Sequence, residues 1–96
     1  MTKDDVLQRL RQHKRMLQER YGVERIGLFG SYAKGEQTAH SDIDLFVVFR
    51  QKTLDNITGL WLFLEEMYGK NIDLFYRHAR MREGLKTQIE EEIIYA

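Results

Sequence analysis

Hydrophobic residues recur at helical spacing in three parts of the chain. Residues 3–20 carry apolar positions three or four apart with charged residues between them, which predicts an amphipathic helix. A second helix is predicted between Thr53 and Gly69, two residues suited to begin and end it. Apolar residues then repeat every four positions near the C-terminus, and they predict a last helix over about 82–95.

The two later helices also carry residues whose surroundings can be predicted. Trp61 and Met67 fall on the apolar face of the second helix, so we expect both to pack in the core rather than to contact a ligand. The last helix contains Glu90, Glu91 and Glu92 in succession, and we expect these three side chains to form a solvated shoulder.

Three short apolar runs, at about 24–29, 42–49 and 71–76, predict strands. The middle run is apolar on both faces, which is typical of a central strand covered on two sides. A helix joins the second strand to the third, and this order suits a parallel crossover, whereas the direction of the first strand is left open. We therefore predict an α/β (α+β) fold with a small mixed or parallel three-stranded sheet and helices packed on it.

The first candidate chemistry lies where the first strand ends. Gly30 and Ser31 follow the apolar run and begin a helical turn, and such a turn presents free backbone N–H groups and the positive end of a dipole. These features favour phosphate, and Lys34 follows within one turn as a further candidate phosphate contact. The sequence thus predicts Gly30, Ser31 and Lys34 as nucleotide-binding residues.

Three aspartates supply the second candidate chemistry. Asp42 and Asp44 stand two apart at the start of the second strand, so both carboxylates project the same way. Asp73 lies beside them if the second and third strands are neighbours. Three crowded carboxylates repel, and two Mg²⁺ ions with their preference for oxygen ligands remove that conflict. Two such ions would support in-line displacement at the α-phosphorus of a nucleoside triphosphate.

A purely structural interpretation of the same residues stays open. Gly30 and Ser31 could form an ordinary capped turn, and Asp42 and Asp44 could cap loops at a strand edge. Asp73 could form a buried ion pair with one of three arginines, namely Arg25, Arg77 or Arg80.

Composition sets the wider limits. The 96 residues suit one domain, 1–96, and the chain has no cysteine for disulfides or thiolate metal sites. Fifteen basic residues balance fifteen acidic ones, so we expect no direct binding to nucleic acid or to an anionic membrane. No apolar run approaches the length of a membrane span and no signal-peptide core follows Met1, so a cytoplasmic location is expected.

The combined motifs resemble the minimal nucleotidyltransferase (MNT) group of the DNA polymerase β-like nucleotidyltransferase superfamily. The family pattern is a strand-borne Gly-Ser, a gap near ten residues, Asp-x-Asp and a later strand-borne acidic residue, and here these stand as Gly30-Ser31, Asp42-Ile43-Asp44 and Asp73. The likeness extends through the ending Ile89–Tyr95 and so covers nearly the whole chain. It implies a three-aspartate, two-magnesium site that uses ATP. The segment 77–84 lacks the proline found in many relatives.

Members of this group are often antitoxins paired with a HEPN-domain toxin, and some transfer AMP to a tyrosine of that toxin. The resemblance therefore implies a protein adenylyltransferase that forms a hetero-oligomer with its partner. Two alternatives remain, a non-catalytic antitoxin that neutralises its partner by binding, and a small-molecule nucleotidyltransferase of the aminoglycoside-modifying type. Besides Lys34, four further basic residues are candidates for contacting phosphate or partner: His40, Arg77, Arg80 and Arg82.

Overall fold

The computed structural model describes all 96 residues and contains five helices and four strands. In chain order the elements are α1 (Lys3–Gln12), α2 (Lys14–Tyr21), β1 (Val23–Phe29), α3 (Ser31–Lys34), β2 (Ile43–Phe49), α4 (Leu54–Tyr68), β3 (Ile72–Tyr76), α5 (Glu83–Glu92) and β4 (Ile94–Tyr95). None of the helices combines the length and the apolar character that crossing a membrane requires.

The strands form one mixed sheet in the order β3-β2-β1-β4. β2 is the central strand, as its apolar run predicts, and it pairs in parallel with β3 and antiparallel with β1. The α/β class and the mixed sheet are thus confirmed. The predicted number of three strands is wrong, because β4 adds a fourth strand antiparallel to β1.

β4 also shortens the last helix relative to the prediction of 82–95. α5 ends at Glu92, Ile93 is extended, and the next two residues pair with Gly27 and Leu28 at the free edge of β1. A strand edge offers unpaired backbone groups, and pairing there satisfies them. The four-residue apolar repeat continues to Ile93 across this boundary, so the periodicity gives no sign of the change.

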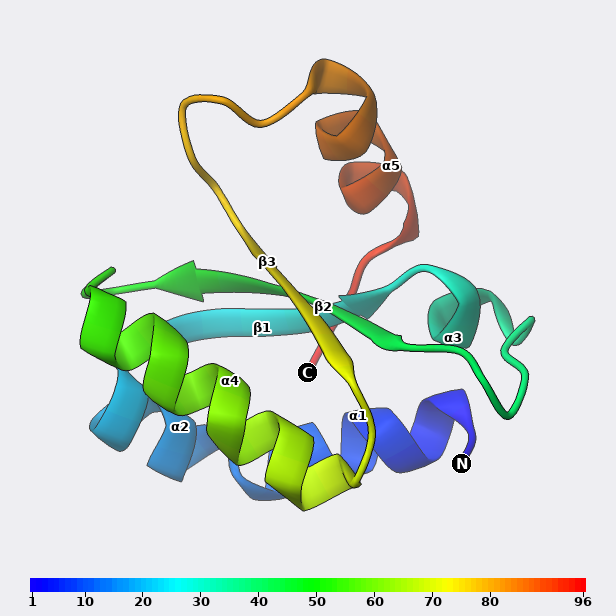
Figure 1. Cartoon of the computed structure of the whole chain (residues 1–96), viewed down its shortest axis with the longest axis horizontal. Coiled ribbons are helices and arrows are strands. Elements are labelled where there is room, and N and C mark those ends of the chain that lie inside the picture. The colour runs from blue at the N-terminus through cyan, green and yellow to red at the C-terminus, as the bar shows by residue number, and fades with distance from the viewer.

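Helices cover the two faces of the sheet unequally. In Figure 1, α1, α2 and α4 lie below the sheet and α5 lies above it. The lower side holds a core of 15 buried residues, and the upper side holds a smaller cluster of four, namely Phe29, Phe46, Met81 and Ile89. Most of the burial that stabilises the fold is therefore on the side covered by three helices, and the other side is only partly covered, by α5.

The predicted N-terminal helix over residues 3–20 is divided in two. Thr2 begins α1 with a capping box, and Gly22 ends α2 in the left-handed conformation. Between them the helix breaks at His13, whose ring nitrogen lies 2.8 Å from the carbonyl oxygen of Arg9. The apolar repeat lapses between Leu10 and Leu17, so few core contacts hold a continuous helix together there.

α4 has the predicted bounds, with Thr53 as its cap and Gly69 as its stop. Met67 packs against the core as expected. Trp61 does not, because its side chain is 43% exposed and its indole N–H donates to the carbonyl oxygen of Ile72 at 2.9 Å. The amphipathic nature of the indole explains this position, since the ring lies at the surface while its N–H ties α4 to β3.

Candidate active site

The sheet topology brings the predicted motifs to one edge. β1 ends where β2 begins, because the two strands are antiparallel, and β3 begins beside β2, because these two are parallel. In this register Phe29 lies opposite Asp44, and Asp44 lies opposite Asp73. The Gly30-Ser31 turn and two of the three predicted carboxylates therefore stand on three neighbouring strand ends.

Gly30 is the residue through which the turn and the carboxylates touch. Its φ of 76° lies in the region that favours glycine, and its backbone is buried. A Cβ atom built on Gly30 would collide with the carboxylate oxygen Oδ2 of Asp44. Glycine at this position thus serves both the turn and the close approach of Asp44.

α3 begins at Ser31, directly after this turn, and Lys34 lies at its end. The first N–H groups of a helix have no partner within the helix, so they are available to an anion. The structure thus places Gly30, Ser31 and Lys34, the three residues predicted to bind nucleotide, in one turn and the helix that follows it.

Asp44 and Asp73 are close enough for their charges to affect each other. The pKa of Asp44 is raised to about 6, first by burial, then by the neighbouring Asp73, and further by the charges of Asp42 and Glu92. The site therefore concentrates negative charge at a half-buried position, which is costly without a compensating cation.

Asp42 occupies a different position from the other two. It lies just before β2 and is exposed, and no three acidic or histidine side chains converge tightly enough to form a ready-made metal centre. The donor set nevertheless fits Mg²⁺, because it consists of carboxylate oxygens and because a divalent cation relieves the repulsion on Asp44. Asp42 would have to turn toward the pair to complete the predicted set.

The buried ion pair considered for Asp73 is not present. The structure has three ion pairs, Arg15–Glu19, Lys34–Glu92 and Lys86–Glu83, and Asp73 is exposed at the sheet edge. The structural interpretation of Asp73 as a buried ion-pair partner is therefore wrong.

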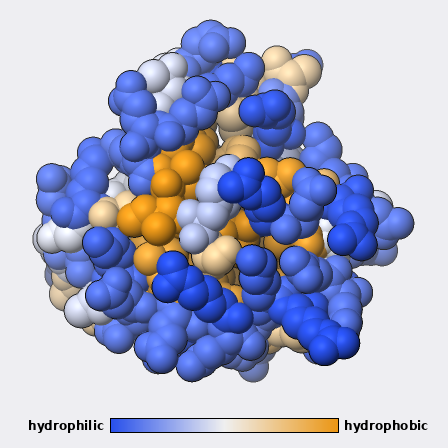
Figure 2. Space-filling view, turned by 180° about the vertical axis from the view of Figure 1, so that it is seen from behind, coloured by the Kyte–Doolittle hydropathy of each residue, from blue (hydrophilic) through white to orange (hydrophobic).

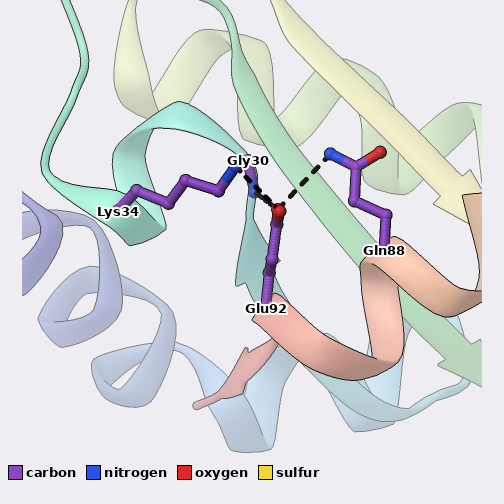
Figure 3. Close-up of polar contacts among 4 residues, drawn as sticks. All are labelled: Gly30, Lys34, Gln88 and Glu92. Atoms are coloured by element: carbon purple, nitrogen blue, oxygen red, sulfur yellow. Dashed lines mark hydrogen bonds and ion pairs between the residues drawn. The ribbon is translucent and has the colours of Figure 1, made fainter.

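Glu92 is the site residue that the sequence did not reveal, since we expected it to be solvated. Its side chain is 17% exposed, and its Oε2 lies 2.8 Å from the Lys34 ammonium. Its Oε1 accepts the Gly30 N–H at 3.2 Å and the Gln88 amide at 3.4 Å, as Figure 3 shows. Three consecutive glutamates look alike in sequence, and which of them faces the turn depends on how α5 docks.

A groove lies beside α5 at the C-terminal ends of β2 and β3, the ends away from the three aspartates. It has a volume of about 710 Å³, and its lining combines apolar residues such as Phe46 and Val48 with the basic residues Arg25, Lys52, Arg77 and Lys86. Figure 2 shows the molecule from behind, where apolar surface lies in the middle and hydrophilic residues surround it. Phe46 follows Asp44 by two positions in β2, so the groove begins on the face that carries the carboxylates.

Comparison with known proteins identifies the family of the chain. The model of the nucleotidyltransferase domain family matches residues 10–96. The chain belongs to this family. Its mixed α/β fold agrees with the fold class predicted from the sequence and with the resemblance to minimal nucleotidyltransferases.

Two relatives of this nucleotidyltransferase align over almost their whole length. A protein of Methanocaldococcus jannaschii, provisionally named a protein adenylyltransferase, is 38% identical, and the alignment covers 98% of this chain and 97% of the relative. The protein adenylyltransferase MntA of Thermococcus cleftensis is 33% identical, with 99% and 96% covered.

Two solved structures also resemble the nucleotidyltransferase described here. One, provisionally assigned as a minimal nucleotidyltransferase, has a TM-score of 0.78 and 33% identity over 98% of this chain and 95% of its own. The other is a chain of a toxin–antitoxin complex with AMP-PNP, with a TM-score of 0.65 and 27% identity over 99% of this chain and 72% of its own.

Proposed function

We propose that this nucleotidyltransferase is a Mg²⁺-dependent protein adenylyltransferase that moves AMP from ATP to a hydroxyl of a toxin protein in the cytoplasm, and so acts as an antitoxin. The acceptor we propose is a tyrosine of a HEPN-domain toxin. The observation that carries the proposal is the contact of Gly30 with Asp44, with Asp73 opposite Asp44, because it joins a phosphate-binding turn to a carboxylate pair.

The residues have distinct tasks in this proposal. The Ser31 hydroxyl, the neighbouring backbone N–H groups and Lys34 would bind the β- and γ-phosphates, which leaves the α-phosphorus facing the carboxylates. Asp42, Asp44 and Asp73 would hold Mg²⁺, which when bound neutralises phosphate charge and activates an acceptor hydroxyl. The acceptor oxygen then forms a bond to the α-phosphorus, the bond to pyrophosphate breaks, and the hydroxyl proton leaves to solvent.

The acceptor would come from a second protein. Relatives that align over nearly their full length carry the name protein adenylyltransferase, and a related chain occurs in a toxin–antitoxin complex with AMP-PNP. The basic, apolar groove, which begins at Phe46 on the face that carries Asp44, would receive the acceptor segment, and no acidic residue lines it. An acidic segment of the toxin therefore has the complementary charge.

The test uses α-labelled ATP, Mg²⁺, this protein and the protein encoded by its neighbouring gene, which is the proposed toxin. We expect label on the toxin and loss of toxin activity below one equivalent of the enzyme. The control is Asp42→Asn combined with Asp44→Asn, checked for folding by circular dichroism. Undiminished labelling by the folded control would contradict the assigned roles. Inhibition that requires one full equivalent and leaves no label would establish neutralisation by binding instead.

A further inference from the structure

Glu92 binds the same two groups that the proposed function assigns to nucleotide phosphates. One of its oxygens accepts a hydrogen bond from the Gly30 N–H at 3.2 Å, and the other forms an ion pair with the Lys34 ammonium at 2.8 Å. The two carboxylate oxygens are thus placed on a backbone donor and a cation, the combination of donors that recognises phosphate oxygens. Figure 3 shows the side chain reaching from the end of α5 to the turn.

We propose that Glu92 occupies the place of a phosphate oxygen in the nucleotide-free protein, and that the triphosphate displaces it from the Gly30-Ser31 turn. This inference rests on the proposed function, because it assumes that ATP binds at this turn. It adds a residue that sets nucleotide affinity, carried by the C-terminal helix rather than by the turn or the carboxylates.

Donor counting shows why the two anions compete. Lys34 has three N–H donors and can bind Glu92 and a phosphate together. Gly30 has one N–H, which points to Oε1 of Glu92, and a phosphate that needs this donor must replace the carboxylate. The competition therefore centres on Gly30, and Lys34 remains bound to an anion throughout.

The charges around the site favour the exchange. Asp44 already senses the negative charges of Asp73, Asp42 and Glu92. A triphosphate brings further negative charge next to Glu92, and the repulsion favours release of this carboxylate from the turn. Mg²⁺ would compensate the negative charge of the aspartates. Gln88, which donates to the same Oε1 at 3.4 Å, lies one turn earlier on α5 and offers Glu92 a partner after release.

The exchange links the nucleotide to the C-terminal segment. Glu92 is the last residue of α5, and β4 begins two residues later on the edge of β1. Loss of the contact to Gly30 removes one of the two attachments of this helix end to the turn and leaves only the ion pair with Lys34, which the phosphate shares. Nucleotide binding is therefore expected to loosen the end of α5, which is followed by β4, whose Tyr95 lines the basic groove.

The test compares Glu92→Gln with Glu91→Gln. Both remove one negative charge from α5, but Glu91 is exposed and contacts neither Gly30 nor Lys34. Calorimetric titration with the non-hydrolysable analogue α,β-methylene-ATP and Mg²⁺ is expected to show about three- to tenfold tighter binding for Glu92→Gln, the scale of one partly exposed charged contact. Glu91→Gln is expected to bind like the wild type.

A second measurement follows the helix end directly in the wild type. Amide hydrogen exchange over residues 88–95 is expected to speed up when the analogue binds, and to be fast already in Glu92→Gln without it. Weaker or unchanged binding by Glu92→Gln, while the wild type binds normally, would overturn the displacement and leave the proposed function standing. A wild-type protein that binds no nucleotide would overturn both.

Discussion

Gly30 combines a positive φ with a close approach to Asp44. Its replacement therefore tests whether the contact between the turn and the carboxylates is needed. Gly30→Ala places a methyl group against Asp44 at a φ of 76°. We expect the turn to move away from Asp44, with a strain of about 1–2 kcal/mol and a loss of at least about tenfold in kcat/KM for AMP transfer. Steady-state kinetics and urea unfolding measure the two effects.

Gly35→Ala is the matched control for this variant. Gly35 also has a positive φ, of 71°, but a Cβ there meets no atom within 4 Å. The control therefore carries the backbone strain without the collision. We expect it to lose stability while keeping most of its activity. If both variants lost activity equally, the contact with Asp44 would not be the reason that Gly30 is needed.

Asp44 opposes folding at neutral pH for the same reason that it can hold a cation. Its pKa is raised to about 6 in the folded protein, above its ordinary value of 3.8. Its stabilising contribution is therefore complete below about pH 4 and is lost as the pH rises through 6. Above pH 6 the folded state holds an ionised carboxylate that burial and neighbouring charges disfavour.

Asp44→Asn is accordingly expected to abolish AMP transfer and to stabilise the fold. In EDTA at pH 8 we expect an increase in Tm of about 5 °C, which shrinks toward zero at pH 4. Mg²⁺ at pH 8 is expected to raise the Tm of the wild type and to have little effect on Asp44→Asn. Thermal unfolding by circular dichroism measures both proteins in all three conditions. A gain in Tm that does not depend on pH would rule out ionisation of Asp44 as its source.

At the scale of elements, local patterns predicted most of the fold. The helix between Thr53 and Gly69 has its predicted bounds, because both caps act through neighbouring backbone groups. The three strands lie within one residue or so of the predicted runs, since β-branched and aromatic residues cluster there. The positions of Gly30, Asp44 and Asp73 at one edge follow from these elements and their order.

The features that the sequence did not reveal depend on contacts between distant elements. β4 forms because the edge of β1 is free, and Glu92 reaches Gly30 across 62 positions because α5 docks over the sheet. The partial exposure of Trp61 likewise depends on its hydrogen bond to β3. The pattern of residues within one segment contains no such information. It therefore predicted a last helix that continues to 95, a solvated Glu92 and a buried Trp61.

The attachment of β4 to β1 can be tested through one stacked pair. The Arg25 guanidinium lies 3.7 Å from the centroid of the Tyr95 ring, so the two strands are held by side chains as well as by backbone pairing. Tyr95→Ala is expected to lower the free energy of unfolding by about 1–2 kcal/mol, measured by urea titration. Tyr95→Phe keeps the ring and is expected to behave like the wild type. A large loss in Tyr95→Phe would assign the effect to the hydroxyl instead.

At the scale of the whole molecule, balanced charge conceals a local imbalance. Basic and acidic residues number fifteen each, yet the groove is lined by Arg25, Lys52, Arg77 and Lys86 and by no acidic residue. Of these four, Lys86 has an ion-pair partner, Glu83, within 3.4 Å, and the others have none. The field over the groove is therefore positive although the chain as a whole is neutral, and an acidic acceptor segment would be attracted to this side.

Charge reversal in the groove tests this attraction. Lys52→Glu combined with Arg77→Glu is expected to raise the KM for the toxin about tenfold or more and to leave the KM for ATP unchanged, because an interfacial charge acts on the partner that it faces. Arg11→Glu combined with Arg15→Glu makes the same change in net charge on α1 and α2, which lie on the opposite side of the sheet in Figure 1. This control is expected to transfer AMP normally. The wild-type KM for the toxin should also rise with salt, and that of the groove variant should not. Equal losses in both double variants would mean that net charge, rather than the groove, governs the encounter with the acceptor.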